Sequence, residues 1–400
     1  MNGTAMSGRP PSATAVDDAV TDALCAAVFA SLPRRDQRDR ARRYIEGLLT
    51  TGGRKSFRNM AIQLGGGDRL EQRLHHFVSC STWDWEAVRL ALTDEMRRHV
   101  PTEAWVLRSL LIPKDANETV GVHRRYVPGP GRMLDVQYAV GLWSASTTAI
   151  HPLDWRLVLP RVWTDDPGRR ARVALPPGSR AETPGGCAVR MYLDAAEWRP
   201  TGPPARPVVV DVEGADVVGL IQQLRASRVP FLVKTDRGVP LTLVEQDSPR
   251  PSSRPRPCHR ILEATTPSGP SGPDGVVAAA RVRSPLRAVR RGGADDARRD
   301  ERPEAGRGRS PDADDLLLIG DRDGRGCPTG AVWLTDMLDV DVPRLTALTA
   351  LARRTDAALA ATAVPLGIKD FTGRTYDGWN RHATLVSVAH CATALSAPAR

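Results

Sequence analysis

The chain has 400 residues, 41% of them hydrophobic, so it is long enough for two or three units with a substantial core. A net charge of +10 favours polyanionic partners. The alternative explanation is a general bias toward arginine, with most of the charges simply solvated. No run approaches eighteen apolar residues, which excludes a membrane-spanning helix. Six scattered cysteines without a C-x-x-C pair, and no recognisable signal peptide, predict a cytoplasmic protein with free thiols.

The N-terminal hundred residues predict a disordered tail over 1–14 and a helical domain over 15–100. Apolar residues recur at helical spacing in three segments, which are 41–49, 70–78 and 85–96. Arginines occupy the opposite positions of the first segment, and Gly52 and Gly53 end it. This cationic face predicts binding to double-stranded DNA. The predicted contacts are Arg38, Arg42, Arg43, Arg54 and Lys55.

Residues 101–246 change to the pattern of a mixed sheet. Short apolar or alternating runs separated by Pro and Gly predict strands at 105–112, 120–126, 134–142 and 155–159. A strand at Val208–Asp211, a helix at 216–227 and a strand at 231–234 then form a crossover unit with parallel strands. The fold class is therefore α/β, with an antiparallel part followed by a parallel part.

Residues 247–312 are dominated by Pro, Arg, Gly, Ser and Asp, which predicts a disordered insertion, because such a stretch buries too little apolar surface to fold. Residues 313–400 return to an ordered pattern. Strands are expected at 316–319 and 331–334, and helices at 343–362 and 376–395. His382 and His390 lie on one face of the last helix, where buried, hydrogen-bonded histidines are expected.

Asp211 ends the apolar strand Val208–Val210, a position that often presents a metal ligand at a sheet edge. The alternative is that its carboxylate caps the turn that follows. The chain has no P-loop, no G-x-G-x-x-G after a strand, no H-E-x-x-H and no G-x-S-x-G. Asp211 is thus the one candidate for catalysis and for metal binding.

Several blocks of sequence resemble, in order, the bacterial insertion-sequence DDE transposases. They are YIEGLL (Tyr44–Leu49), RKS (Arg54–Ser56), LEQRLHHF (Leu70–Phe77), WDWEAV (Trp83–Val88), VGVHRRY (Val120–Tyr126), LPRVWTDD (Leu159–Asp166), VVVD (Val208–Asp211), WLTD (Trp333–Asp336) and GIKDFTGRTYDGWNRHATLVSVAH (Gly367–His390). The resemblance implies a helical DNA-binding region followed by a ribonuclease H-like core of a mixed sheet flanked by helices. It also implies two Mg²⁺ ions, held by acids on the first strand, the fourth strand and a late helix.

Only one of these three acids is expected to be present. Asp211 matches the second acid, whereas the first falls on Arg108 and Ser109 and the third on Ala361. Asp356 is the nearest acid on the late helix, but five residues correspond to about 140° at α-helical geometry, so we expect it to face elsewhere. An arginine at the first position would repel metal ions. Asp115, just past the first strand, and Asp135, on the neighbouring strand, are the alternative candidates for the missing acids.

Three hypotheses follow. In the first, the chain is an active recombinase that uses Mg²⁺. In the second, it is a DNA-binding protein related to such an enzyme that is catalytically impaired or recruited for regulation. In the third, it is a protein-interaction module. The missing acids favour the second, because losing two ligands abolishes two-metal catalysis. The sequence leaves the oligomeric state open, with a homodimer on DNA among the alternatives.

Overall fold

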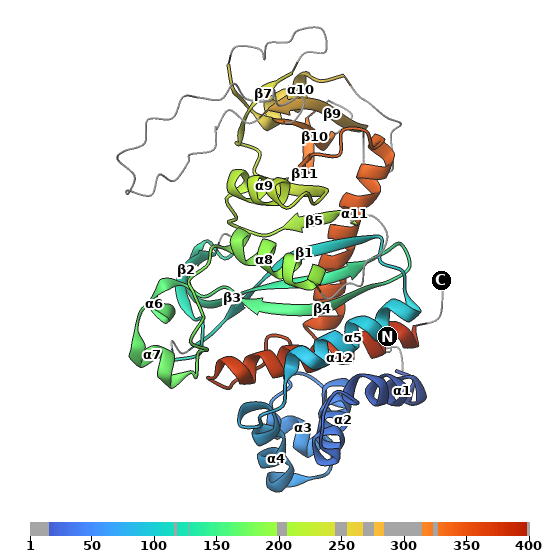
Figure 1. The fold of residues 1–400 in the computed structure, drawn as a ribbon, viewed down its shortest axis with the longest axis vertical. Coiled ribbons are helices and arrows are strands. Elements are labelled where there is room, and N and C mark those ends of the chain that lie inside the picture. The colour runs from blue at the N-terminus through green and yellow to red at the C-terminus, as the bar shows by residue number, and fades with distance from the viewer. Residues whose placement is uncertain are drawn as a thin grey trace, which may run out of the picture. The chain divides into compact units, whose positions relative to one another are not determined.

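A computed structural model describes residues 16–115, 118–127, 129–197, 206–244, 254–266, 276–283, 314–322 and 327–397 (Figure 1). The chain divides into two compact units. The first comprises Met1–Glu103, Arg108–Glu182 and Arg354–Arg400, and the second comprises Ala104–Leu107 and Thr183–Arg353. The predicted tail over 1–14 lies outside the described residues.

The first unit begins with five helices, and the three predicted in this region are among them. They are α1 (Asp18–Phe29), α2 (Arg35–Thr50), α3 (Phe57–Gln63), α4 (Gly67–Ser79) and α5 (Trp85–His99). In α2 the predicted apolar stripe is buried, with Ala41, Tyr44, Ile45 and Leu48 all in the core. The Asp84 side chain caps α5 by accepting a hydrogen bond from the Glu86 amide at 2.8 Å.

The C-terminal helix α12 (Tyr376–Ser396) lies at the centre of this unit. It packs against α1, α2, α4 and α5 on one side and against strand β4 (Ile150–Leu157) on the other. Its residues from Gly378 to Ala392 are all buried, as expected for a helix covered on every side. His382 accepts a hydrogen bond from the Tyr44 hydroxyl at 2.9 Å and donates to the Gly367 carbonyl at 2.8 Å, which confirms the prediction made for this histidine. The N-terminal helices thus share their core with the end of the chain.

The strands of the first unit form an antiparallel layer. They are β2 (His123–Val127), β3 (Arg132–Ala145), β4 and the last part of β1 (Ala104–Pro113), with β3 pairing with each of the others. Two short helices follow, α6 (Arg161–Thr164) and α7 (Pro167–Arg172). At Gly141 a Cβ atom would lie 2.7 Å from the Trp155 ring, so only glycine allows this strand to approach the indole.

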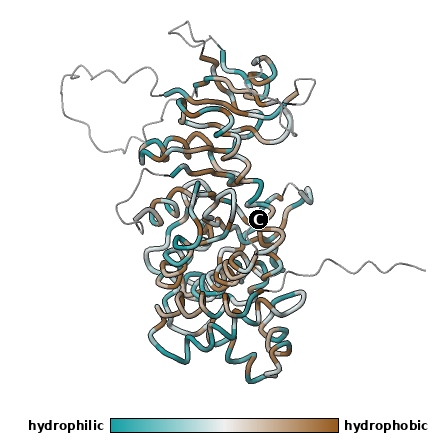
Figure 2. The backbone as a smooth tube through the Cα atoms, turned by 90° about the vertical axis from the view of Figure 1, so that its right-hand side faces the viewer, coloured by the Kyte–Doolittle hydropathy of each residue, from teal (hydrophilic) through white to brown (hydrophobic). Residues whose placement is uncertain are grey.

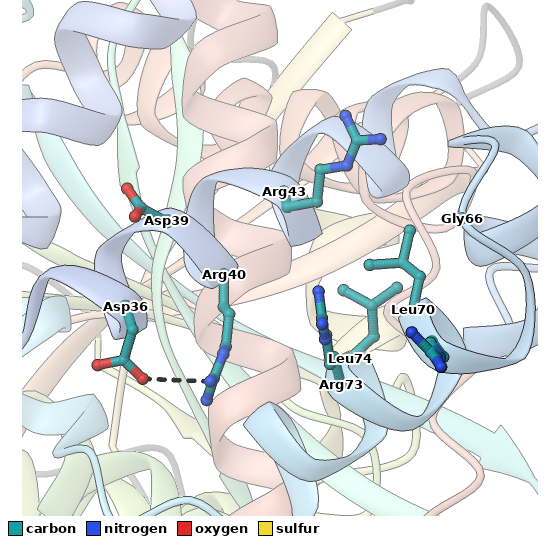
Figure 3. A pocket seen from close by; sticks show the side chains of 9 residues that line it. Asp36, Asp39, Arg40, Arg43, Gly66, Leu70, Arg73 and Leu74 are labelled. Carbon is teal, nitrogen blue, oxygen red and sulfur yellow. Dashed lines mark ion pairs between the residues drawn. The ribbon is translucent and has the colours of Figure 1, made fainter.

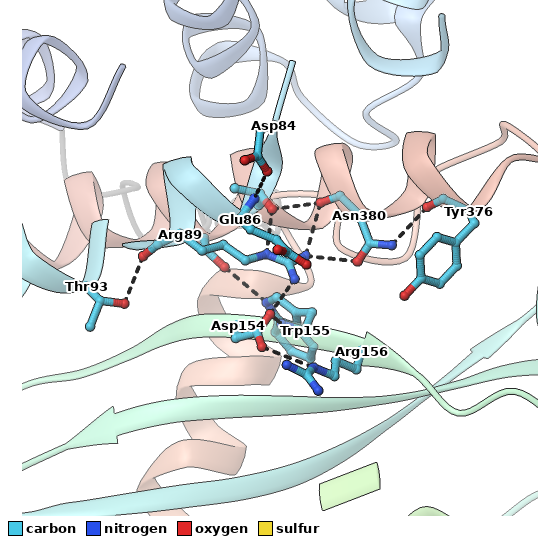
Figure 4. Close-up of polar contacts among 11 residues, drawn as sticks. Asp84, Glu86, Arg89, Thr93, Asp154, Trp155, Arg156, Tyr376 and Asn380 are labelled. Carbon is cyan, nitrogen blue, oxygen red and sulfur yellow. Dashed lines mark hydrogen bonds and ion pairs between the residues drawn. The ribbon is translucent and has the colours of Figure 1, made fainter. Parts of the chain in front are cut away.

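A buried arginine network, comprising Arg89, Asp154, Asn380 and Thr384, joins α5, β4 and α12 (Figure 4). The side chains of Arg89 and Asp154 are 4% and 1% exposed and form an ion pair. Arg89 also donates to the Thr384 hydroxyl at 2.8 Å and to the Asn380 side-chain oxygen at 3.2 Å. Burial lowers the pKa of the Arg89 guanidinium, and the charge of Asp154 opposes that shift. The network therefore depends on each charge having its partner.

The second unit contains a mixed sheet in the strand order β1-β5-β6-β11-β10-β9-β7-β8, in which β1 contributes Ala104–Leu107. Its elements are α8 (Pro184–Glu197), β5 (Val208–Asp211), α9 (Val217–Ala226), β6 (Phe231–Thr235), β7 (Pro240–Leu243), β8 (Arg256–Pro257), α10 (Cys258–Ala264), β9 (Val276–Arg283), β10 (Asp315–Arg322), β11 (Pro328–Thr335) and α11 (Val342–Ala358). Strands β5 and β6 are parallel and joined through α9, as predicted. Figure 2 shows much of this sheet in brown, as expected for strands with consecutive buried residues. The predicted mixed α/β fold is confirmed.

The prediction of a disordered insertion over 247–312 does not hold for all of that stretch. Strand β8, helix α10 and strand β9 lie within it, and β9 pairs antiparallel with both β10 and β7. Ala278, Ala280 and Val282 alternate along β9 and are buried, and Ile261 and Leu262 of α10 are buried as well. Small apolar residues are enough to form strand β9, because the neighbouring strands β10 and β7 supply its pairing partners. The rest of the stretch lies outside the described residues.

No helix in the described part of the chain is long and apolar enough to cross a membrane. All six cysteines are described and are free thiols, as predicted. Four of them are buried, whereas Cys80 and Cys327 are exposed.

Candidate functional site

Asp211 lies at the carboxyl end of β5 and is 6% exposed. The parallel register of β5 and β6 pairs Val210 with Val233, so the next residues, Asp211 and Lys234, lie side by side. The Lys234 ammonium is 3.0 Å from the Asp211 carboxylate. The predicted metal ligand therefore already has a cationic partner from the adjacent strand.

Arg108, at the position of the first acid, lies in β1 with its side chain 22% exposed. Its Nε donates to the Asp356 carboxylate near the end of α11, and both residues belong to the first unit. Ser109, the next residue, is buried. The residue that the sequence resemblance aligns with the first acid is thus an arginine, and it pairs with Asp356 of α11.

The partner of Arg108 differs from our expectation that Asp356 faces elsewhere. Helix α11 ends at Ala358 and continues as a π-helix over Leu359–Ala363, with the Val364 amide donating to the Leu359 carbonyl at 2.9 Å. Asp356 lies in the α-helical part and Ala361 in the π-helix, which turns less per residue, so the angle of about 140° calculated for a regular α-helix overestimates the rotation between them. Ala361, where the third acid was expected, is an exposed residue of this π-helix. Asp356 is thus the acid of this helix whose carboxylate contacts β1, the strand on which the first acid was expected.

The described residues do not fit a pair of divalent ions. Among them, no group of three or more His, Cys, Asp or Glu side chains is arranged to hold a metal. Asp211 contacts an ammonium and Asp356 contacts a guanidinium, so each carboxylate is occupied by a charge of the same sign as the ion it would bind. We therefore derive no catalytic step through Mg²⁺.

The five predicted DNA contacts lie on or just after α2, but they are not equally available. Arg38 and Arg54 are exposed, and neither guanidinium forms an ion pair with another described residue. Arg42 pairs with Asp22 at 2.6 Å, and Arg43 pairs with Glu46 at 2.8 Å. These two charges are partly neutralised within the protein.

Lys55 differs from the four arginines, because it is only 7% exposed. Its ammonium donates to the Thr51 carbonyl, and its backbone amide donates to the Asp370 carboxylate at 2.8 Å. Burial lowers the pKa of this lysine. Its side chain anchors the turn after α2 and is not part of the exposed cationic face.

The sequence model of a family described as "DDE superfamily endonuclease" matches residues 27–303, more than half of the chain. The chain belongs to this family of DDE endonucleases. The resemblance to DDE transposases inferred from the sequence is therefore confirmed, and membership implies a DNA substrate. A search of curated proteins finds no match. The family match includes Arg108 and Asp211 but ends before α11.

Proposed function

We propose that this DDE endonuclease relative binds double-stranded DNA but does not cleave it by two-metal catalysis. The observation that carries the proposal is Arg108, which stands at the first-acid position and holds Asp356 in an ion pair. Asp356 then takes the place of Ala361 as the acid of the late helix. A cytoplasmic location and a homodimer on DNA stay predictions.

The charge of Arg108 opposes metal binding in two ways. It removes a carboxylate that would attract the ion, and it adds a guanidinium that stays protonated at any physiological pH. At an effective dielectric constant of about 20, two like unit charges that lie about 4 Å apart repel each other by about 4 kcal/mol, and a divalent ion carries two such charges. Lys234 acts in the same direction beside Asp211. Each of the two carboxylates would therefore have to bind a metal ion beside a positive charge of the protein.

We expect no strand cleavage by the purified protein in Mg²⁺ or Mn²⁺. Supercoiled plasmid and labelled duplexes would be incubated with protein in each metal, and nicked and linear products would be quantified on gels. The matched control is Asp211→Ala, which removes the one acid that sequence alone predicts. Cleavage by the wild-type protein that disappears in this variant would contradict the proposal, whereas equal background in both proteins supports it.

Binding to duplex DNA is supported by family membership, by the net charge of +10 and by the exposed arginines of the N-terminal helices. We expect the affinity to fall steeply with salt, because each neutralised phosphate contributes about 0.9 to the slope of log K against log salt. Replacing Arg38 and Arg54 with alanine should lower this slope by about 1 to 2 units.

The matched control for this prediction is the Arg97→Ala/Arg98→Ala variant, which removes the same formal charge from exposed side chains of α5 that are already paired with Asp94 and Glu95. Its slope should change less. The affinities of all three proteins are measured by fluorescence anisotropy of a labelled duplex over a range of potassium chloride concentrations. An affinity that does not change between low and moderate salt would exclude the proposed binding.

A further inference from the structure

A groove of about 660 Å³ lies between α2 and α4 in the first unit, and six of its nine lining residues are charged (Figure 3). Four of the six are arginines. They are Arg40, Arg43, Arg69 and Arg73. We propose that this groove binds the phosphate backbone of duplex DNA, with Arg69 and Arg73 as its principal phosphate contacts. The proposal rests on the DNA binding argued above and assigns it to a specific place.

The two arginines of α4 are the available cations of the groove. Arg69 and Arg73 are exposed and lie four residues apart, so they project from the same face of the helix. Within the described part of the chain neither side chain forms an ion pair or a hydrogen bond. Two neighbouring guanidiniums without an internal partner repel each other, and an anion placed between them removes that repulsion.

The arginines of α2 are already engaged and form the opposite wall. Arg40 pairs with Asp36 at 3.2 Å, and Arg43 pairs with Glu46 and donates to the Leu64 carbonyl at 2.7 Å. These contacts fix their guanidiniums along the groove and leave several of their N–H donors for a ligand. The wall is therefore ordered before a ligand arrives, which lowers the entropy cost of binding.

The two acids of the groove do not cancel its positive charge. Asp36 also accepts two hydrogen bonds from Arg34, at 2.9 and 3.0 Å, and these bonds lower the pKa of its carboxyl group. Arg34 and Arg40 together thus compensate Asp36. Asp39 is the one remaining acid of the lining, against Arg69 and Arg73, since Arg43 pairs with Glu46. The groove keeps a positive balance.

The lining favours a nucleic-acid backbone over an apolar small molecule. Sites for small organic ligands are lined predominantly by apolar and aromatic side chains. Here the apolar lining is limited to Leu70 and Leu74, and guanidiniums surround it. A planar guanidinium binds a phosphate through two parallel hydrogen bonds, and several in one groove can follow successive phosphates of a strand.

The test is the Arg69→Ala/Arg73→Ala variant of the full-length chain, titrated against a labelled duplex at several salt concentrations. We expect the slope of log K against log salt to fall by about 1.8 units for two lost phosphate contacts. Between about 50 and about 200 mM salt the wild-type protein should then lose about tenfold more affinity than the variant. Circular dichroism spectra would confirm that the variant is folded.

Two further variants separate a groove effect from a general loss of charge. The Arg97→Ala/Arg98→Ala variant removes the same charge from exposed arginines of α5 that pair with Asp94 and Glu95, and its slope should stay near the wild-type value. The Arg69→Lys/Arg73→Lys variant keeps the charge, so it should keep the slope but bind more weakly. A loss that is equal in the groove and α5 variants would overturn the assignment to the groove.

The outcomes also distinguish this inference from the proposed function. If the wild-type protein does not bind the duplex, the proposed function fails. If it binds and the groove variant binds equally well with the same slope, the function stands and the groove assignment fails. Inorganic phosphate replacing chloride at constant ionic strength tests for a free-anion site. Displacement of the duplex by phosphate alone would show that the groove binds a small anion and would overturn the assignment to a DNA backbone.

Discussion

Replacing Arg108 with aspartate is expected to make the stability of the protein depend on divalent metal. In the variant a shorter carboxylate on β1 faces Asp356 across the space that the Arg108 side chain now fills, so the ion pair becomes two like charges. Without metal we expect a lower melting temperature than that of the wild-type protein. Mn²⁺ placed between the two carboxylates removes the repulsion, and at about 100 times its dissociation constant it stabilises the folded state by about 2.7 kcal/mol. Thermal melts in EDTA and in a Mn²⁺ titration measure this difference.

The matched control is Arg108→Met, which removes the cation without adding a carboxylate. It should melt below the wild-type protein but show no response to Mn²⁺, because Asp356 alone is a weak ligand. The wild-type protein should show none either, since Arg108 and Lys234 hold the two acids. A metal response of equal size in all three proteins would contradict the account of Arg108 as the charge that prevents metal binding.

The central strands and helices could be predicted because their signals are local. The apolar run that ends in Asp211 and the amphipathic segment after it give β5 and α9 at nearly the predicted bounds. Strand β9 could not be predicted, because its alanines have weak strand preference and it forms by pairing with β10 and β7, far along the chain. Its surroundings, rich in Pro and Arg, indicated disorder instead.

The candidate site could be predicted in its residues but not in its contacts. Asp211 was found from its place at the end of a strand, and Arg108 from its register with the family pattern. The pairing of Asp211 with Lys234 depends on the register between β5 and β6, which no local pattern gives. The contact of Asp356 depends on where α11 meets β1. Counting residues along a regular helix placed the third-acid position on Ala361 and did not predict the contact between Asp356 and Arg108.

Breaking the buried arginine network is expected to have the largest effect on stability. Arg89→Met leaves the Asp154 carboxylate buried, with only the Arg156 guanidinium near it at 3.5 Å. Removing one partner of a buried ion pair costs about 3–5 kcal/mol, because the other charge stays out of water, and Arg156, which is 24% exposed, compensates only part of it. We therefore expect the free energy of unfolding to fall by about that amount. Chemical denaturation followed by tryptophan fluorescence measures it, since Trp155 lies next to the network.

A double-variant cycle decides whether the lost charge pairing is the cause. In Arg89→Met/Asp154→Asn neither member is charged, and the asparagine oxygen can still accept the hydrogen bond of the Trp155 amide, now 2.7 Å long. The double variant should therefore be more stable than Arg89→Met alone, because no uncompensated charge remains buried. Arg98→Met, the same substitution on the exposed side of α5, should change stability by less than about 0.5 kcal/mol. Strictly additive losses in the double variant would show that packing, and not charge compensation, makes Arg89 important.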